Sequence, residues 1–185
     1  MRCGRLGLLC ALTLCAPMVT PNVTLAQRAV VVSSTESGSA AIAEALAAGA
    51  PTPIRRAIDE MHRSSATFRR QCLRLAAAQR VHISMHFDPR LTSSSWRART
   101  AINRRDGQVV SARVLLPLSL QAVELIAHEL EHILEQIDGV DLPRHVDAGA
   151  VWKDGDGSFE SARAIGIGRR VAQEVAARHS LVVRR

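Results

Sequence analysis

The chain lacks tyrosine and has few other aromatic side chains, since phenylalanine and tryptophan together make up only 3% of its 185 residues. Its core must therefore be built mainly from Ala, Val, Leu and Ile, which favours thin and mostly helical packing. A chain of this length fits one domain and can bury a core without disulfides or metals to hold it together.

Cysteine is also scarce, and three of the four cysteines lie within the first 15 residues. These residues belong to a segment typical of a secretory signal peptide. Arg2 and Arg5 give it a positive start, residues 6–16 are apolar, and a small-x-small cleavage site follows. We therefore predict a signal peptide over residues 1–26 and a mature domain over residues 27–185.

Removal of this segment leaves Cys72 as the one cysteine, so the mature domain has no partner for an internal disulfide. Export without disulfides suits a bacterial periplasmic or secreted protein. The apolar run is shorter than the roughly 20 residues that span a bilayer. We therefore expect no stable membrane span after cleavage.

Lysine is nearly absent, because 23 of the 24 basic residues are arginine. The formal net charge is +7, and loss of Arg2 and Arg5 leaves 22 basic against 17 acidic residues, or +5. A basic chain can bind nucleic acid, but in an exported protein an anionic envelope polymer or lipid headgroup is the better candidate partner. An arginine-rich genome gives the same composition without any partner, and we expect no nucleic-acid binding.

Residues 128–132 read His-Glu-Leu-Glu-His, within a stretch that we expect to form one helix over residues 120–137. On a helix, side chains four residues apart lie on one face with Cβ atoms about 5–6 Å apart, so His128 and His132 can reach one metal ion. Zinc with three protein ligands keeps a position for water and lowers its pKa to about 7. Glu129 stands where a carboxylate can take that proton, a pattern typical of metal-assisted hydrolases.

The expected helix has one apolar side and one side that carries both histidines. At about 100° per residue, the apolar side is formed by Val123, Ile126, Ala127, Leu130, Ile133, Leu134 and Ile137. Glu124 and Glu135 flank the histidines on the other side. This separation favours a metal site over accidental surface histidines, with Glu124 as a candidate partner that orients His128.

The remaining patterns predict a mixed α and β chain. We expect a mobile lead-in over 27–39, helices over 40–48, 54–79 and 159–178, a strand over 81–87, and a hairpin of strands 96–104 and 108–116. Asp106-Gly107 is the hairpin turn. Ser119 and Ser158 are the expected caps of the last two helices, and Gly139 ends the first of them. His82 and His86 are interpreted as the polar outer face of a strand.

A third ligand must come from beyond His132, and the candidates are Asp138, Asp141, His145, Asp147 and Glu160. Asp138 has the spacing of a metzincin ligand, but that pattern needs glycine where this chain has Glu135. Glu160 opens the expected final helix, which would give it a fixed orientation.

With this set of residues the chain resembles the gluzincin group of zinc metallopeptidases, which have H-E-x-x-H on one helix and a glutamate ligand on a later one. It is also similar to a set of small exported bacterial proteins of uncharacterised role, through residues 124–132 and 159–164. The resemblance covers the C-terminal third. It implies that His128, His132 and Glu160 ligate Zn²⁺ and that Glu129 is the general base.

Two positions depart from the gluzincin pattern. Ala164 stands where many members have an aspartate that orients a histidine ligand. Those enzymes also commonly use a tyrosine or histidine to stabilise the oxyanion, and this chain has no tyrosine. His145 and Arg163 are the candidates for that role by sequence position.

The sequence thus predicts a single α+β, zincin-like domain with N-terminal helices, a small and mainly antiparallel sheet, the H-E-x-x-H helix, and a C-terminal helix that carries the third ligand. The predicted function is that of an exported zinc metallopeptidase that cleaves a peptide or other amide bond in a peptide or protein substrate. The alternative is a catalytically idle zinc-binding envelope protein that binds an anionic polymer through its basic surface.

Overall fold

The computed structural model describes residues 25–78, 81–91, 98–119, 121–148, 150–153 and 158–183, so the predicted signal peptide lies almost wholly outside the described residues. The elements are α1 (Leu25–Ala48), α2 (Thr52–Ser64), α3 (Ala66–Ala77), β1 (His82–Phe87), β2 (Arg99–Arg105), β3 (Gln108–Leu116), α4 (Ala122–Ile137), the 3-10 helix η1 (Leu142–Ala148), β4 (Val151–Lys153), β5 (Phe159–Ser161) and α5 (Ala162–Val183). They form one α+β domain, as predicted. None of the helices within the described ranges is long and apolar enough to cross a membrane.

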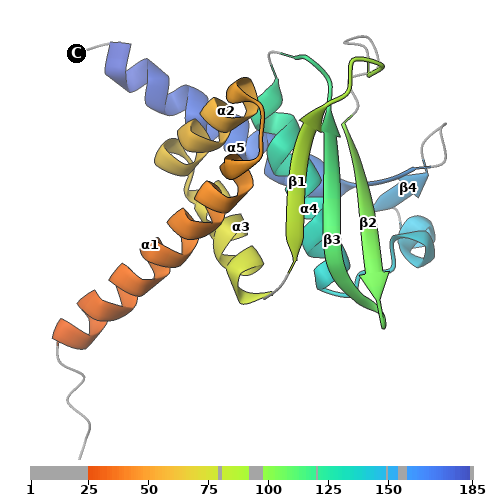
Figure 1. Ribbon diagram of the computed structural model, residues 1–185, viewed down its shortest axis with the longest axis horizontal. Helices are drawn as coiled ribbons and strands as arrows, with labels where there is room; N and C mark the ends of the chain where they lie inside the picture. The colour runs from red at the N-terminus through yellow and green to blue at the C-terminus, as the bar shows by residue number, and fades with distance from the viewer. Residues whose placement is uncertain are drawn as a thin grey trace, which may run out of the picture.

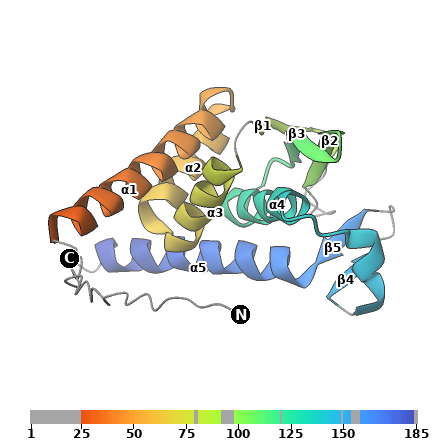
Figure 2. The same ribbon diagram turned by 90° about the horizontal axis from the view of Figure 1, so that it is seen from below.

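Helix α4 lies at the centre of the molecule, between the three-stranded sheet and α5, while α2 and α3 pack beside it and α1 packs on α2 and α3 (Figures 1 and 2). Its apolar side faces this core, since Ile126, Leu130 and Ile133 are each fully buried. Phe68 from α3 and Val114 from β3 belong to the same buried cluster. The predicted apolar side of α4 is therefore confirmed, and its other side is left for polar groups.

The sheet has the order β1-β3-β2, with β1 parallel and β2 antiparallel to the central β3. The prediction of a mainly antiparallel sheet is thus only partly correct. Strand β3 lies between the two earlier strands and is antiparallel to β2 but parallel to β1. The hairpin turn is confirmed. Asp106 and Gly107 both have positive φ, 52° and 78°, as a two-residue turn requires. His82 and His86 are exposed on β1, as expected for the polar outer face.

Two predictions for the N-terminal helices are wrong. The single helix expected over 54–79 is broken at Ser65, whose backbone is extended and whose Oγ accepts a hydrogen bond from Phe68 N, so that it caps α3. The lead-in expected over 27–39 is helical and belongs to α1. Ser39 is buried there and its Oγ donates to the Arg69 carbonyl, so tertiary packing outweighs its weak helix propensity.

The last helix begins three residues later than predicted. Residues 159–161 form strand β5, which pairs with β4 in a short antiparallel ladder, and α5 begins at Ala162. Its cap is Ser161 rather than Ser158, because Ser161 Oγ accepts a hydrogen bond from Ala164 N. Glu160 therefore lies on a strand and not on the C-terminal helix.

Candidate metal centre

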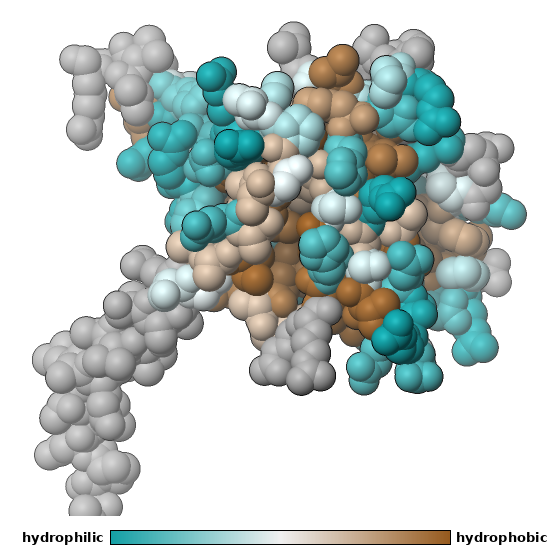
Figure 3. Space-filling model, viewed as in Figure 1, coloured by the Kyte–Doolittle hydropathy of each residue, from teal (hydrophilic) through white to brown (hydrophobic). Residues whose placement is uncertain are grey.

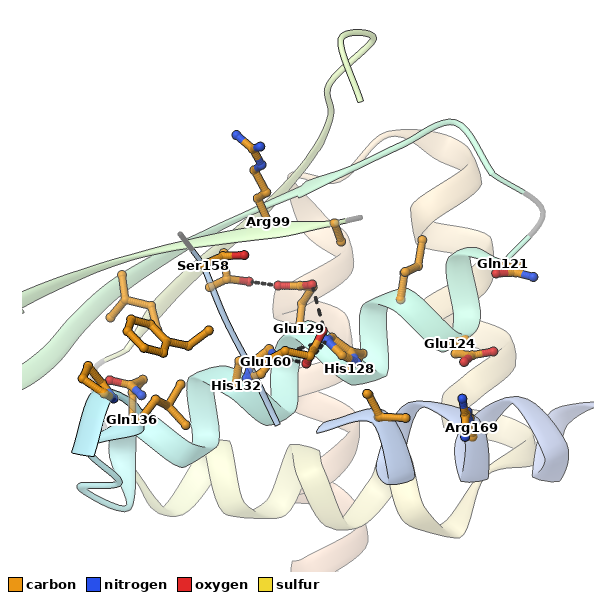
Figure 4. A pocket seen from close by; sticks show the side chains of 18 residues that line it. Arg99, Gln121, Glu124, His128, Glu129, His132, Gln136, Ser158, Glu160 and Arg169 are labelled. Atoms are coloured by element: carbon orange, nitrogen blue, oxygen red, sulfur yellow. Dashed lines mark hydrogen bonds and ion pairs between the residues drawn. The ribbon is translucent and has the colours of Figure 1, made fainter. Parts of the chain in front are cut away.

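Helix α4 presents two imidazoles to a shared point. The Nε2 atoms of His128 and His132 are 3.1 Å apart, and the rings meet edge to face with centroids 4.8 Å apart. Glu160 reaches the same point from β5, with Oε1 at 3.2 Å from His128 Nε2 and 3.1 Å from His132 Nε2 (Figure 4). The structure thus brings the three sequence-predicted ligands together.

The spacing of these three atoms fits a zinc ion. Bonds of 2.0–2.1 Å to nitrogen and oxygen in a tetrahedral site place neighbouring ligand atoms about 3.3–3.4 Å apart. The separations between His128 Nε2, His132 Nε2 and Glu160 Oε1 are 3.1 to 3.2 Å, so a shift of roughly 0.2 Å would match that geometry. Within the described residues, these three are the one group of histidine and acidic side chains with such convergence.

Glu160 is held by its own strand. Its Oε1 accepts a hydrogen bond from Ser161 N at 2.9 Å, and the pairing of Phe159 to Ser161 with β4 fixes the backbone. Burial opposes the charge of Glu160, but hydrogen bonds from His128 and His132 outweigh it and hold its pKa well below the ordinary value. The side chain therefore offers an ionised oxygen to the site.

The Nδ1 atom of His132, on the far side of the ring from Nε2, also has a hydrogen-bond partner. His132 Nδ1 lies 2.9 Å from Glu135 Oε2, and Ser161 Oγ donates to Glu135 Oε1 at 2.7 Å. Burial disfavours the charged imidazolium, but bonds to Glu135 and Glu160 raise the pKa of His132 to about 10. A carboxylate on the far nitrogen is the arrangement that orients histidine ligands and increases their basicity.

Glu129 lies beside this group and is only 4% exposed. Its Oε1 is 4.0 Å from His128 Nε2, while its Oε2 accepts a hydrogen bond of 2.5 Å from Thr100 Oγ1 on β2. Burial raises the pKa of Glu129, against the opposing effects of the His128 charge and the Thr100 hydroxyl. A carboxylate at this position can accept or donate a proton beside the three candidate ligands.

A cavity of about 820 Å³ opens over these side chains. Figure 4 shows α4 running along it from Gln121 to Gln136, with Glu129 and the ligand group between these ends. Strand β2 borders the cavity through Arg99, Thr100 and Ile102, and α5 contributes Arg169. The three candidate ligands and Glu129 therefore line a cavity large enough for a small molecule or a peptide side chain.

Other sequence candidates are engaged elsewhere. Asp138 accepts from Arg74 at 2.6 Å and from Arg163 at 3.0 Å, which rules it out as the third ligand in this arrangement. Arg163 also donates to buried Glu131, and Arg74 donates to the same oxygen. Arg163 is not among the residues that line the cavity, so it is not placed to stabilise an oxyanion there.

The candidates on the loop after α4 do not reach the centre either. His145 is exposed, with Nδ1 bonded to the Asp141 carbonyl at 2.8 Å, and it does not line the cavity. The Asp141 carboxylate pairs with Arg144. The side chain of Asp147 lies outside the described side chains.

Gly168 on α5 sets the distance between the two helices beside His128. A Cβ at this position would lie 2.9 Å from the Glu124 carbonyl oxygen and 3.2 Å from His128 Cβ. The two helices therefore approach closely at Gly168, whereas Gly166 has open space around it. Glu124 borders the cavity, but among the described residues it forms no hydrogen bond or ion pair with His128, contrary to expectation.

Sequence reasoning missed two residues that support the centre, Thr100 and Ser161. Thr100 is one hydroxyl residue within an otherwise ordinary strand, and nothing in the chain links it to position 129. Ser161 had a detectable signal, because a serine two residues after an aromatic strand residue and just before an alanine-rich helix is a good N-cap. The cap itself also contacts Glu135.

Comparison with known proteins gave no match. No family model matches the chain, and no curated protein or solved structure is significantly similar to it.

Proposed function

We propose that this protein is an exported zinc-dependent hydrolase with a zincin-like fold, most similar in its ligand set to the gluzincin metallopeptidases, that cleaves peptide or other amide bonds. One observation carries the proposal. Two imidazole nitrogens of α4 and one carboxylate oxygen of β5 lie 3.1 to 3.2 Å apart, and Glu129 stands beside them at 4.0 Å.

The number of ligands favours a catalytic site. Structural zinc sites are usually closed by four protein ligands, whereas catalytic sites have three and keep one position open. Two histidines and a glutamate, with a cavity above them, correspond to the second kind. Zinc bound there would polarise a carbonyl and lower the pKa of water to about 7.

The chain's own side chains supply the proton transfers. Glu129 accepts a proton from the attacking water and then donates it to the leaving nitrogen. Burial raises the pKa of Glu129, which makes the carboxylate a better base and its acid form accessible, while its position 4.0 Å from His128 Nε2 places it beside the site. Neither His145 nor Arg163 is placed for the developing oxyanion, which leaves Arg169 of α5 as the cavity arginine on the α4 side of the sheet, among the described residues.

A peptide substrate is favoured by the position of β2. This strand is at the edge of the sheet, pairs with β3 on one side and borders the cavity. An extended chain can add to such an edge through main-chain hydrogen bonds. A peptide bond held along β2 would thereby lie over Glu129.

The alternative function, binding of an anionic envelope polymer without catalysis, is favoured by the charge of the sheet. Strands β1, β2 and β3 contain no aspartate or glutamate, but they carry Arg99, Arg104, Arg105 and Arg113. No helix covers the face that Figure 1 presents to the viewer, and hydrophilic side chains are spread among apolar ones over it (Figure 3).

Substitution of the general base separates the two functions. We expect Glu129→Gln in the purified mature protein to retain one zinc per chain and to lose peptide hydrolysis, measured with a library of fluorogenic peptides. Glu44→Gln on the exposed side of α1 is the matched control and should hydrolyse peptides like the wild type. Equal activity of Glu129→Gln and wild type would refute the proposed mechanism. Absence of hydrolysis in the wild type, with polyanion binding in both, would support the alternative.

A further inference from the structure

The Thr100 side chain joins the sheet to the proposed general base by a hydrogen bond. It lies on the face of β2 that points toward α4, opposite the fully buried Val114 of β3. Its hydroxyl donates to Glu129 Oε2 at 2.5 Å. This distance is at the short end of the range for hydrogen bonds between a hydroxyl and an oxygen acceptor.

The bond determines which way the Glu129 carboxylate faces. The terminal torsion of a glutamate is broad, with little intrinsic preference, so a partner on one oxygen fixes the plane of the group. With Oε2 held by Thr100, Oε1 is directed to the ligand group and lies 4.0 Å from His128 Nε2. Loss of the hydroxyl would free the carboxylate to turn.

Threonine suits this task better than other hydroxyl residues. Its β-branched side chain is stiff at χ1 and is well accommodated in a strand, so the hydroxyl is held in one direction without a second partner. The backbone of Thr100 is itself fixed by pairing with β3. The donor therefore belongs to the sheet, whereas the carboxylate belongs to α4.

We propose that Thr100 is a positioning residue, which orients the Glu129 carboxylate toward the site through its hydroxyl and so sets the rate of the chemical step. The proposal rests on the proposed function, because it assigns a role in hydrolysis. Since β2 is also the edge available to an extended substrate, the strand that would hold the substrate is the one that orients the base.

Kinetics of three variants test the proposal. Thr100→Val keeps the shape and removes the donor, and we expect kcat to fall about 10- to 100-fold, the range typical for partners of this kind, with KM within about twofold and zinc content unchanged. Thr100→Ser restores the donor and should bring kcat to within about threefold of the wild type. Ser84→Val, a hydroxyl loss on β1 away from the cavity, should leave kcat unchanged.

A second measurement does not depend on activity. In metal-free protein, Thr100→Val should raise the unfolding equilibrium constant by about tenfold or more in the Glu129 background, as expected when a buried acceptor loses its donor. It should raise this constant much less in the Glu129→Leu background, because the acceptor is then gone. Urea unfolding of the four proteins gives the coupling.

The outcomes are distinct. A Thr100→Val protein with wild-type kcat, or a Thr100→Ser protein as slow as Thr100→Val, overturns the positioning role while the hydrolase assignment stands. Equal effects of Thr100→Val in both backgrounds overturn the hydrogen bond itself. A wild-type protein that hydrolyses no peptide refutes the proposed function, and the role of Thr100 falls with it even if the coupling is present.

Discussion

Two glycines of α5 offer a matched test of how closely this helix approaches the candidate metal centre. Gly166 and Gly168 are two residues apart in one helix, and an added Cβ meets nothing within 4 Å at Gly166. At Gly168 the same atom would lie 2.9 Å from a carbonyl oxygen of α4 and 3.2 Å from His128 Cβ. Substitution by alanine therefore changes helix propensity alike at both positions and packing at only one.

The magnitudes follow from these contacts. Alanine in place of glycine in a helix interior increases stability by about 0.5–1 kcal/mol, and Gly166→Ala should show this gain. At Gly168 the neighbour is backbone, so the helices must separate, and overpacking of this kind costs about 1–3 kcal/mol. We expect Gly168→Ala to be about 1–3 kcal/mol less stable than Gly166→Ala, or roughly 2–12 °C lower in Tm.

The separation should also disturb the ligand geometry, because the displaced atom is His128 Cβ. Zinc affinity, measured by competition with a chromogenic chelator, should fall on the order of tenfold in Gly168→Ala, the lower end of the loss seen when a ligand's support is removed, and should not change in Gly166→Ala. Urea unfolding in the presence of chelator gives the stability difference without metal. Equal stability and equal zinc affinity of the two variants would refute the helix contact.

Three further predictions concern the ligands and the pH dependence of folding. Glu160→Ala should reduce zinc content well below one per chain in elemental analysis, whereas Asp138→Ala should retain zinc; equal zinc in wild type and Glu160→Ala would remove Glu160 from the site. Glu135→Gln should weaken zinc binding by about 10- to 100-fold because it changes the partner of His132 Nδ1, and an unchanged Kd would contradict that role. Burial opposes the charge of Glu174, but hydrogen bonds from the start of α3 outweigh it and lower its pKa below the ordinary 4.5. The ionised Glu174 carboxylate therefore stabilises the fold fully above about pH 4.5, and this stabilisation is lost as the pH falls through the lower folded-state pKa. In urea unfolding, the free energy of unfolding of Glu174→Gln should fall less steeply with acid than that of the wild type. Parallel pH curves for the two proteins would contradict this role of Glu174.

The features that could be predicted from the sequence are those set by neighbouring residues. The alternation of apolar and polar residues in α4 places His128 and His132 on one side of the helix without reference to the rest of the chain. Asp106-Gly107 likewise sets its own turn, because both residues tolerate positive φ. In each case the identity and spacing of neighbouring residues are enough to determine the local geometry.

The features that could not be predicted depend on contacts between distant segments. The break at Ser65 is stabilised by Glu174, which is 109 residues away and accepts from the Ser65 hydroxyl. The Phe159 to Ser161 segment forms a strand because β4 pairs with it, although its sequence runs directly into a helix. The link from Thr100 to Glu129 also joins separate elements. No local pattern encodes such pairings.

The arginine pair beside α4 has a consequence for the direction of the two histidines. Arg74 of α3 and Arg163 of α5 both donate to Glu131, which is 1% exposed, and none of the three lines the cavity. These bonds restrain the rotation of α4 about its axis, and with it the direction of both imidazoles. The orientation of the histidine pair is therefore set in part by two arginines of other helices that lie outside the cavity.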